Sequence, residues 1–395
     1  MENIFAGGSN SPIIYPSMFP KKILRANGPY LFDKSGKRFV DLWMGYGALL
    51  FGHADEVLNK AINRQLKRGT LYSSESVLEH QLAQKLIKSI PCAKKVKLAT
   101  TGSEATMYAV RVSRGYTNRE RIIDISGNYH GGNDVLMASV GVPKKISSFI
   151  DYVEFNDLSS LESKLNDNHA AVILEPVMTN CGCILPKKGY LRSVKRLCKK
   201  NGSVLIFDEV VTGFRLSPGG AQQLFGVTPD ISTFSKVLGG GLPISAIVGS
   251  KKIMDCFEPK GKVFFGGTFH ANPLSVSASL SVLPRLKGKD VYRLNCAADN
   301  FRRDLNDFIV DKNLPVQTTG IKSMFSIWFE KSEITSAHQA KKINPNKYKN
   351  FIQSLISKGI CFSPSQFETC FLSTAHTNIM EEISAKIKST ILTNH

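Results

Sequence analysis

Short apolar runs and longer amphipathic stretches alternate through the middle of the chain, from about residue 95 to residue 250. Apolar runs of four or five residues are typical of buried strands, whereas apolar residues that recur every three or four positions are typical of helices that cover a sheet. The pattern predicts strands at 96–99, 121–125, 170–174, 204–207 and 244–248, with helices at 106–116 and 186–201 among them. Such an alternation favours an α/β fold with a parallel sheet and right-handed crossovers.

The two ends of the chain follow a different pattern. Residues 30–41 alternate about a turn at Asp33 to Gly36, which predicts a β-hairpin. Helical spacing predicts helices at 55–67, 75–88, 273–286, 346–358 and 378–392, and a further strand at 324–329. We therefore expect an N-terminal segment (1–54) that packs with a small C-terminal domain (287–395), and a large domain (55–286) between them.

The amino-acid composition excludes few classes of protein. The 395 residues are 42% hydrophobic and 21% charged, which is ordinary for a soluble enzyme. No apolar run approaches the roughly 18 residues that cross a bilayer, and the first residues lack a basic region followed by an apolar one, so we expect a cytoplasmic protein without a membrane partner. The eight cysteines are scattered, and the one tight pair, Cys181 and Cys183, lacks a second pair or a histidine for zinc. We expect free thiols and no metal.

The charge balance is unusual. Lys and Arg total 51 against 32 Asp and Glu, a formal net charge of +19. The basic residues come in short runs without interleaved aromatic residues and without a nucleic-acid-binding motif. A solvated basic face is therefore favoured over nucleic-acid binding, and an acidic substrate stays open.

Candidate chemistry begins with Asp208 and Lys236. Asp208 comes directly after the predicted strand 204–207, at the strand end where open α/β sheets bind ligands, and Lys236 follows 28 residues later, before Gly239 and Gly241. A carboxylate in that place needs a cation, such as a protonated pyridine nitrogen, and a lysine can hold the same ring as a Schiff base. The pair predicts a pyridoxal phosphate site, although a lone lysine before a glycine turn would more simply be a surface residue.

A phosphate site is predicted where strand 96–99 turns into the next helix. The turn contains Thr101, Gly102 and Ser103, and free backbone N–H groups at a helix start bind anions with help from the helix dipole. We assign Gly102 and Ser103 to the cofactor phosphate. On its own, such a turn is more often only a helix N-cap.

Two long blocks, residues 207–215 (FDEVVTGFR) and 239–243 (GGGLP), carry a family resemblance. Together with motifs from Gly7 to His376, they make the chain resemble class III, fold type I aminotransferases, and within that family glutamate-1-semialdehyde 2,1-aminomutases. The resemblance implies a large domain with a mostly parallel seven-stranded sheet, and a smaller α+β domain from the C-terminus and the N-terminal segment. It also implies pyridoxal phosphate, small-molecule amine or amino acid and carbonyl substrates, and a homodimer whose active site is shared across the interface.

The resemblance places further residues at the cofactor. Tyr129 would cover one face of the ring with His130 beside it, although His130 could equally be an ordinary loop residue. Asn156 would lie near the ring hydroxyl, and Thr268 would reach the phosphate of the neighbouring subunit. The remaining cofactor residues that it implies are Thr101, Glu175 and Val210.

The implied substrate pocket is where the chain departs from the family. Its expected residues are Ser11, Tyr46, Arg215 and Glu368. The aminomutase pattern has an arginine that grips a substrate carboxylate, where this chain has Ile14, and the mobile gate is shortened between residues 140 and 152. Arg215 is either an anion anchor or the partner of a sheet-edge carboxylate.

These departures favour amino transfer between two molecules over the aminomutase reaction. Glu368 is retained without its arginine, so it could attract a cationic or hydroxylated substrate group. A basic binding protein on an inactive enzyme scaffold is a third interpretation. The presence of both Asp208 and Lys236 argues against it.

Overall fold

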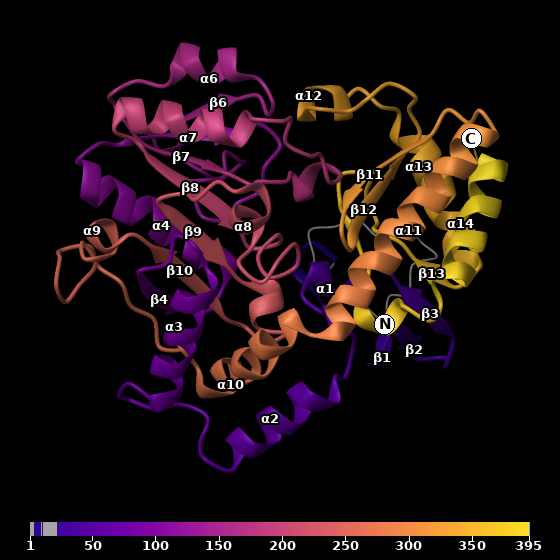
Figure 1. Ribbon diagram of the computed structural model, residues 1–395, viewed down its shortest axis with the longest axis horizontal. Helices are drawn as coiled ribbons and strands as arrows, with labels where there is room; N and C mark the ends of the chain where they lie inside the picture. Colours follow the sequence, from indigo (N-terminus) through magenta and orange to yellow (C-terminus); the bar gives the residue numbers. More distant parts are fainter. Residues whose placement is uncertain (1–3, 9, 11–21, 395) are drawn as a thin grey trace.

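The computed structural model describes residues 4–8, 10 and 22–394. Its largest feature is a seven-stranded sheet in the order β4-β10-β9-β8-β7-β5-β6 (Figure 1). The strands are β4 (Lys95–Ala99), β5 (Arg121–Ile125), β6 (Ile150–Val153), β7 (His169–Leu174), β8 (Val204–Glu209), β9 (Ile231–Phe234) and β10 (Ser245–Gly249). Strands β6, β5, β7, β8 and β9 are parallel, whereas β10 pairs antiparallel with both β9 and β4.

The prediction of a mostly parallel seven-stranded sheet is thus confirmed, and β10 is the strand that runs antiparallel to both of its neighbours. A parallel partner needs a long crossover, but β9 and β10 are joined only by a turn of 3-10 helix (Lys236–Leu238) and a glycine-rich segment. The short connection reverses the chain. It also holds Lys236 directly at the end of β9.

Helices cover both faces of the sheet. Leu205 and Phe207 of β8 pack toward α6 (Leu158–Lys164) and α7 (Tyr190–Asn201), and Val204 and Ile206 pack toward α4 (Gly102–Thr117) and α9 (Lys251–Met254). Burial on both faces explains why these strands are continuous apolar runs. On α7 the basic residues Lys195, Arg196, Lys199 and Lys200 are exposed, as a solvated basic face requires.

The N-terminal strands join the C-terminal part of the chain, and Figure 1 shows them beside the last helices. Strands β1 (Ile23–Asn27), β2 (Tyr30–Asp33) and β3 (Arg38–Asp41) form a sheet with β13 (Ile360–Cys361), and β2 and β3 make the expected hairpin. A second small sheet contains β11 (Gln317–Ile321), β12 (Met324–Trp328) and β14 (Cys370–Phe371). Around them lie α11 (Lys289–Asp311), α13 (Pro345–Ser357) and α14 (Met380–Asn394). The domain boundaries proposed above stay a prediction.

A separate layer of helices lies beside the large sheet. It consists of α2 (Glu56–Leu66), α3 (Val77–Ser89) and α10 (Pro273–Val282), which pack on one another. The helix expected at 273–286 ends at Val282 and continues as a 3-10 turn (Leu283–Lys287), where Pro284 has no N–H to donate. The shorter helices are α1 (Met44–Gly47), α5 (Lys144–Ser147), α8 (Ala221–Phe225) and α12 (Ala337–Ala340).

Three sequence expectations concern absent features. None of the helices in the described residues is long and apolar enough to cross a membrane. Within the same residues no cluster of His, Cys, Asp and Glu could hold a metal ion. All eight cysteines are free thiols, and most of them are buried.

Candidate active site

A cavity of about 170 Å³ lies at the carboxyl ends of the parallel strands. Strand β8 contributes Asp208, and the segments that follow β5, β7 and β9 contribute His130, Glu175 and Lys236. The cavity is lined by Gly102, Ser103, Thr106, Tyr129, His130, Gly131, Glu175, Asn180, Asp208, Val210, Val211, Ser235 and Lys236. The fold therefore gathers most of the predicted cofactor residues around one space.

The start of α4 forms one end of the cavity. Thr101 is the N-cap: its hydroxyl accepts from the Glu104 N–H, and the Glu104 carboxylate accepts from the Thr101 N–H at 2.7 Å. This capping box leaves Gly102 and Ser103 facing the cavity, where the positive end of the helix dipole favours an anion. Thr101 itself does not line the cavity, because its side chain serves the helix.

Gly131 closes the loop that follows β5 onto this anion end. Its φ is +93°, and a Cβ added there would lie 2.1 Å from Ser103 Oγ and 2.6 Å from Ser103 Cα. Only glycine permits both the conformation and the close approach. The next N–H, that of Gly132, donates to Ser103 Oγ at 3.3 Å.

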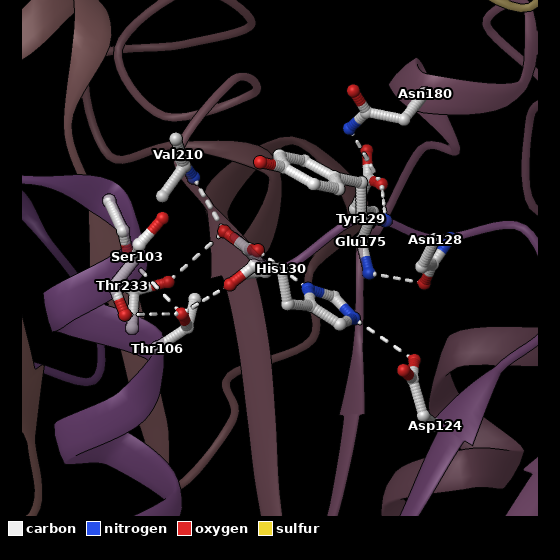
Figure 2. A network of polar contacts seen from close by, with 12 residues as sticks. Ser103, Thr106, Asp124, Asn128, Tyr129, His130, Glu175, Asn180, Val210 and Thr233 are labelled. Atoms are coloured by element: carbon white, nitrogen blue, oxygen red, sulfur yellow. Dashed lines mark hydrogen bonds and ion pairs between the residues drawn. The ribbon is translucent and has the colours of Figure 1, made fainter. Parts of the chain in front are cut away.

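Asp208 contributes a buried negative charge to the cavity, and several donors hold its carboxylate. Its Oδ1 accepts from the Val210 N–H at 3.0 Å and from the Thr233 hydroxyl at 3.1 Å. Its Oδ2 lies 2.6 Å from His130 Nδ1, and His130 Nε2 lies 3.1 Å from Asp124 Oδ1 (Figure 2). Burial alone would lower the pKa of His130, but the Asp124 and Asp208 carboxylates outweigh it and raise that pKa well above its usual range.

Lys236 begins the 3-10 turn after β9, with a φ of 45°. A left-handed lysine is strained, and such strain is concentrated at functional sites. Withdrawal from solvent lowers the pKa of its amine, and the negative charges of Glu175, Glu368 and Asp208 oppose that shift only in part. Lys236 therefore gives up its proton more easily than an ordinary lysine does.

Glu175 stabilises, by hydrogen bonds, the side of the cavity where Tyr129 lies. Its carboxylate accepts from the Tyr129 N–H at 3.1 Å and from the Asn180 side chain at 2.9 Å (Figure 2). It also accepts from the Thr179 N–H at 2.8 Å. Burial and the nearby Asp208 raise the pKa of Glu175. Tyr129 is 49% exposed, which leaves its ring free to cover a flat ligand.

Asn156 does not line this cavity, and its place beside the cofactor ring stays a prediction. Its side-chain amide donates to the carbonyl oxygens of Leu185 and Thr335, each at 3.0 Å, and accepts from the Lys187 N–H at 2.7 Å. It lines a separate cavity with Thr335 and Lys187. Its polar atoms are therefore occupied by the chain itself.

Arg215, predicted as an anion anchor or as the partner of a sheet-edge carboxylate, is bonded to other groups of the chain. It is buried, and its guanidinium donates to Ser323 Oγ at 2.9 Å and to the carbonyl oxygens of Leu372 at 3.0 Å and Gly47 at 2.8 Å. None of the ion pairs among the described residues involves it. Burial lowers the pKa of Arg215 to about 9. It connects the segment after β8 to the C-terminal sheet.

The other predicted pocket residues are only partly placed at the cavity. Tyr46 packs on Trp43 with ring centroids 4.2 Å apart, and it is not among the residues that line the cavity. Burial raises the pKa of Glu368, which the positive charge of Lys236 opposes, so these two side chains influence each other. Ser11 lies outside the described residues, as does Ile14. Thr268 is exposed and does not line the cavity of its own chain.

Sequence reasoning missed several residues of the site. Thr106, Gly131, Asn180, Val211 and Ser235 line the cavity without having been predicted. A signal was available for two residues behind it, because Asp124 is a charge inside an apolar run and Thr233 lies three positions before Lys236. Their contacts with His130 and Asp208 need the assembled sheet.

Comparison with known proteins identifies a family whose enzymes fit this geometry. The sequence model of the class-III aminotransferases matches residues 15–390. The chain belongs to this family. The glutamate-1-semialdehyde 2,1-aminomutase of Sulfolobus acidocaldarius is 40% identical over 97% of this chain and 95% of its own length. That of Methanocaldococcus jannaschii is 38% identical over 97% and 93%.

Solved structures show the same fold. An omega-transaminase from Sphaerobacter thermophilus superimposes with a TM-score of 0.93 at 27% identity, over 98% of this chain and 94% of that one. A glutamate-1-semialdehyde-aminomutase from Pseudomonas aeruginosa, solved with PMP, has a TM-score of 0.86 at 22% identity, over 95% and 88%. The predictions of a fold type I, pyridoxal phosphate-dependent class III enzyme that acts on small molecules are confirmed.

Proposed function

We propose that this enzyme transfers an amino group between two separate small molecules, an amine or amino acid and a carbonyl acceptor. The observation that supports this most strongly is that Lys236, Asp208 and the start of α4 meet at one cavity. An anion end, a buried carboxylate and an amine of lowered pKa are the three groups that pyridoxal phosphate requires.

The residues present fit that cofactor. Gly102 and Ser103 would hold its phosphate, the Tyr129 ring would cover one face, Asp208 would pair with the ring nitrogen, and Lys236 would bind the aldehyde carbon. When bound, pyridoxal phosphate supplies a ring that accepts the electrons of a deprotonated substrate carbon.

Proton movement is the work of Lys236. Because withdrawal from solvent lowers the pKa of its amine, Lys236 is a better base than an exposed lysine, and it lies in the same cavity as Asp208. Its Nζ would take the proton from one substrate carbon and return it to another. Asp208 would stay ionised through its three donors and hold the compensating negative charge.

Transfer between two molecules is favoured by the substrate end of the sequence. Ile14 replaces the arginine that would hold the carboxylate of glutamate-1-semialdehyde, and the gate between residues 140 and 152 is short. Glu368, close enough to Lys236 to affect its charge, suits a substrate with a cationic or hydroxyl group. The aminomutase reaction is the second candidate, because relatives up to 40% identical carry that name.

A visible spectrum with product analysis tests the proposal. Purified holoenzyme is mixed in turn with glutamate, alanine, simple amines, 4,5-diaminovalerate and glutamate-1-semialdehyde. We expect ordinary amino donors to bleach the absorption band of the bound cofactor and glutamate-1-semialdehyde to give no 5-aminolevulinate. Formation of 5-aminolevulinate at the rate of the best donor would instead establish the aminomutase reaction.

We also propose a homodimer in which Thr268 of one subunit completes the cavity of the other. The loop of Thr268 is anchored on α4, since Tyr108 Oη donates to the Gly266 carbonyl at 2.8 Å and His270 Nε2 lies 3.3 Å from Glu104 Oε1. It exposes Phe264 and Phe269 beside the anion end, which suits a protein interface. The cytoplasmic location stays a prediction that cell fractionation would test.

A further inference from the structure

We propose that Asp124 is a positioning residue of the cofactor site: it holds His130 with protons on both ring nitrogens, and through His130 it fixes Asp208 as an ionised acceptor. The inference rests on the proposed place of the cofactor beside Asp208. It concerns a residue that does not line the cavity.

The three side chains form a continuous chain across the sheet. Asp124 belongs to β5 and Asp208 to β8, and His130, in the turn after β5, contacts both. Figure 2 shows the His130 ring directed at Asp124. His130 Nδ1 is 2.6 Å from Asp208 Oδ2, and His130 Nε2 is 3.1 Å from Asp124 Oδ1. The exposed fraction of the side chains is 0% for His130 and 4% for each aspartate. Water is therefore not an alternative partner for the ring.

This geometry decides the protonation of His130. An ionised carboxylate only accepts hydrogen bonds, and a neutral imidazole can donate from only one of its two nitrogens. With a carboxylate oxygen against each nitrogen, a neutral ring would direct a lone pair at one carboxylate. The doubly protonated ring satisfies both contacts, and two carboxylates provide the pairing that a buried cation requires.

The charge of the triad explains what Asp124 contributes. With His130 protonated, Asp124, His130 and Asp208 carry a net charge of −1, which one cation at the cavity end of Asp208 would neutralise. If Asp124 were uncharged and His130 kept both protons, His130 and Asp208 would sum to zero, which weakens the attraction of Asp208 for a protonated ring nitrogen. If His130 instead lost its second proton, the net charge would stay at −1, but the contact between His130 and Asp208 would no longer be a charge-assisted hydrogen bond and would hold Asp208 less firmly.

Other ionisable groups face the triad from the neighbouring strands. Tyr152 of β6 is affected by the charge of Asp124, and its pKa is raised chiefly by burial. The charge of His130 partly offsets the raised pKa of Glu175, after β7, and Lys236, after β9, is affected by Asp208. Glu175 and Lys236 line the cavity, whereas Asp124 contacts His130 Nε2 and does not line it.

Nitrogen NMR of the cofactor-free protein tests the proposal without catalysis. Histidine labelled with ¹⁵N is introduced into wild type and Asp124→Asn, and His130→Gln assigns the His130 signals. Both ring nitrogens of wild-type His130 should be protonated from pH 6 to 9, and in Asp124→Asn His130 should be a neutral tautomer at pH 8. A neutral His130 in the wild type, or an unchanged one in the variant, would overturn the proposal.

The chain offers a matched control in Asp151→Asn. Asp151 Oδ2 lies 2.9 Å from Nε2 of the buried His169, on strands of the same sheet but outside the cavity. This variant should change the His169 signals and leave those of His130 in place. If Asp124→Asn does not fold, the wild-type His130 spectrum alone still decides the protonation.

Cofactor affinity provides the second readout. Titration of the cofactor-free proteins with pyridoxal phosphate should give a Kd about tenfold or more higher for Asp124→Asn and within about twofold of wild type for Asp151→Asn. Equal affinity of Asp124→Asn and wild type would contradict the positioning role. Failure of the wild type to bind the cofactor would contradict the proposed function, whereas the NMR result on His130 would stand.

Discussion

At the scale of single residues, Arg215 shows that the groups around a charged side chain decide its role. The sequence suggests an anion anchor, but the guanidinium is buried and donates to Ser323, Leu372 and Gly47. The carbonyl and hydroxyl oxygens that it satisfies would be costly to leave without donors. We therefore expect Arg215 to contribute to the stability of the fold.

Replacement of Arg215 by Met should therefore reduce stability and leave substrate affinity nearly unchanged. Three acceptors lose their donor, so we expect the free energy of unfolding to fall by about 2–4 kcal/mol, measured by urea denaturation. Exposed Arg64→Met should change it by no more than about 0.5 kcal/mol. A large increase in KM at unchanged stability would restore the anchor.

The observed positions of the predicted site residues show which of them a sequence can locate. Asp208 and Lys236 line one cavity because each lies at or just after the end of a strand, so local order determines their position. Asn156 and Arg215 do not line it, because the groups that hold their side chains lie up to 179 and 168 positions away in the chain. Partners so distant are chosen by the packing of whole elements.

At the scale of elements, the start of α4 combines a helix cap with an anion site. The Thr101–Glu104 capping box satisfies the first turn and turns Gly102 and Ser103 toward the cavity. Helix α3 begins with the same box, in which Ser76 and Glu79 exchange hydrogen bonds of 3.2 and 2.9 Å. It lies away from the cavity and is a natural control.

Thr101→Ala and Ser76→Ala should each lower the free energy of unfolding by about 1 kcal/mol, since each removes one capping hydroxyl. Only Thr101→Ala should also weaken the binding of pyridoxal phosphate, because only its helix faces the anion end. Thermal denaturation and cofactor titration measure the two effects. Equal loss of cofactor affinity in both variants would show that the effect comes from general destabilisation.

Element order was more predictable than element direction. The alternation of strand and helix located five of the seven strands of the sheet, because buried parallel strands must be apolar on both faces, whereas β6 and β9 were not predicted. The reversal of β10 was not predicted, since an apolar run contains no information on its orientation. The length of the connection from β9 was the missing clue.

At the scale of the molecule, His376 joins the two ends of the chain. The Ser373 N–H donates to His376 Nδ1 at 3.0 Å, so Nε2 carries the proton and donates to the Asp41 carbonyl at 3.0 Å. Burial lowers the pKa of His376 to about 4 from an ordinary 6.5. The folded protein therefore holds a neutral ring that acid would protonate.

The sign of the pH effect follows from that shift. Between pH 6.5 and 4 the unfolded chain binds the proton more readily, so His376 stabilises the fold above pH 6.5 and loses this contribution on acidification. Between pH 7.5 and 5 wild type should lose about 2 kcal/mol more than His376→Gln, measured by urea denaturation at both values. A difference between the two proteins that does not vary with pH would contradict this.

The proposed dimer can be tested by complementation. Lys236→Ala and Thr268→Asp are co-expressed with different tags, and the hybrid is purified. If Thr268 acts on the neighbouring cavity, one of the two sites in the hybrid is intact, so about half of the wild-type activity should return although each variant alone is inactive. An inactive hybrid, or a monomer by light scattering, would contradict the shared site.

Covalent mapping of the cofactor tests the central claim most directly. Holoenzyme is reduced with borohydride, digested and analysed by mass spectrometry, with Lys236→Ala as the control. We predict a pyridoxyl group on the peptide that contains Lys236 and no such peptide from the variant. A label on another lysine, or no label on wild type that has been saturated with cofactor, would contradict the assignment of the active site.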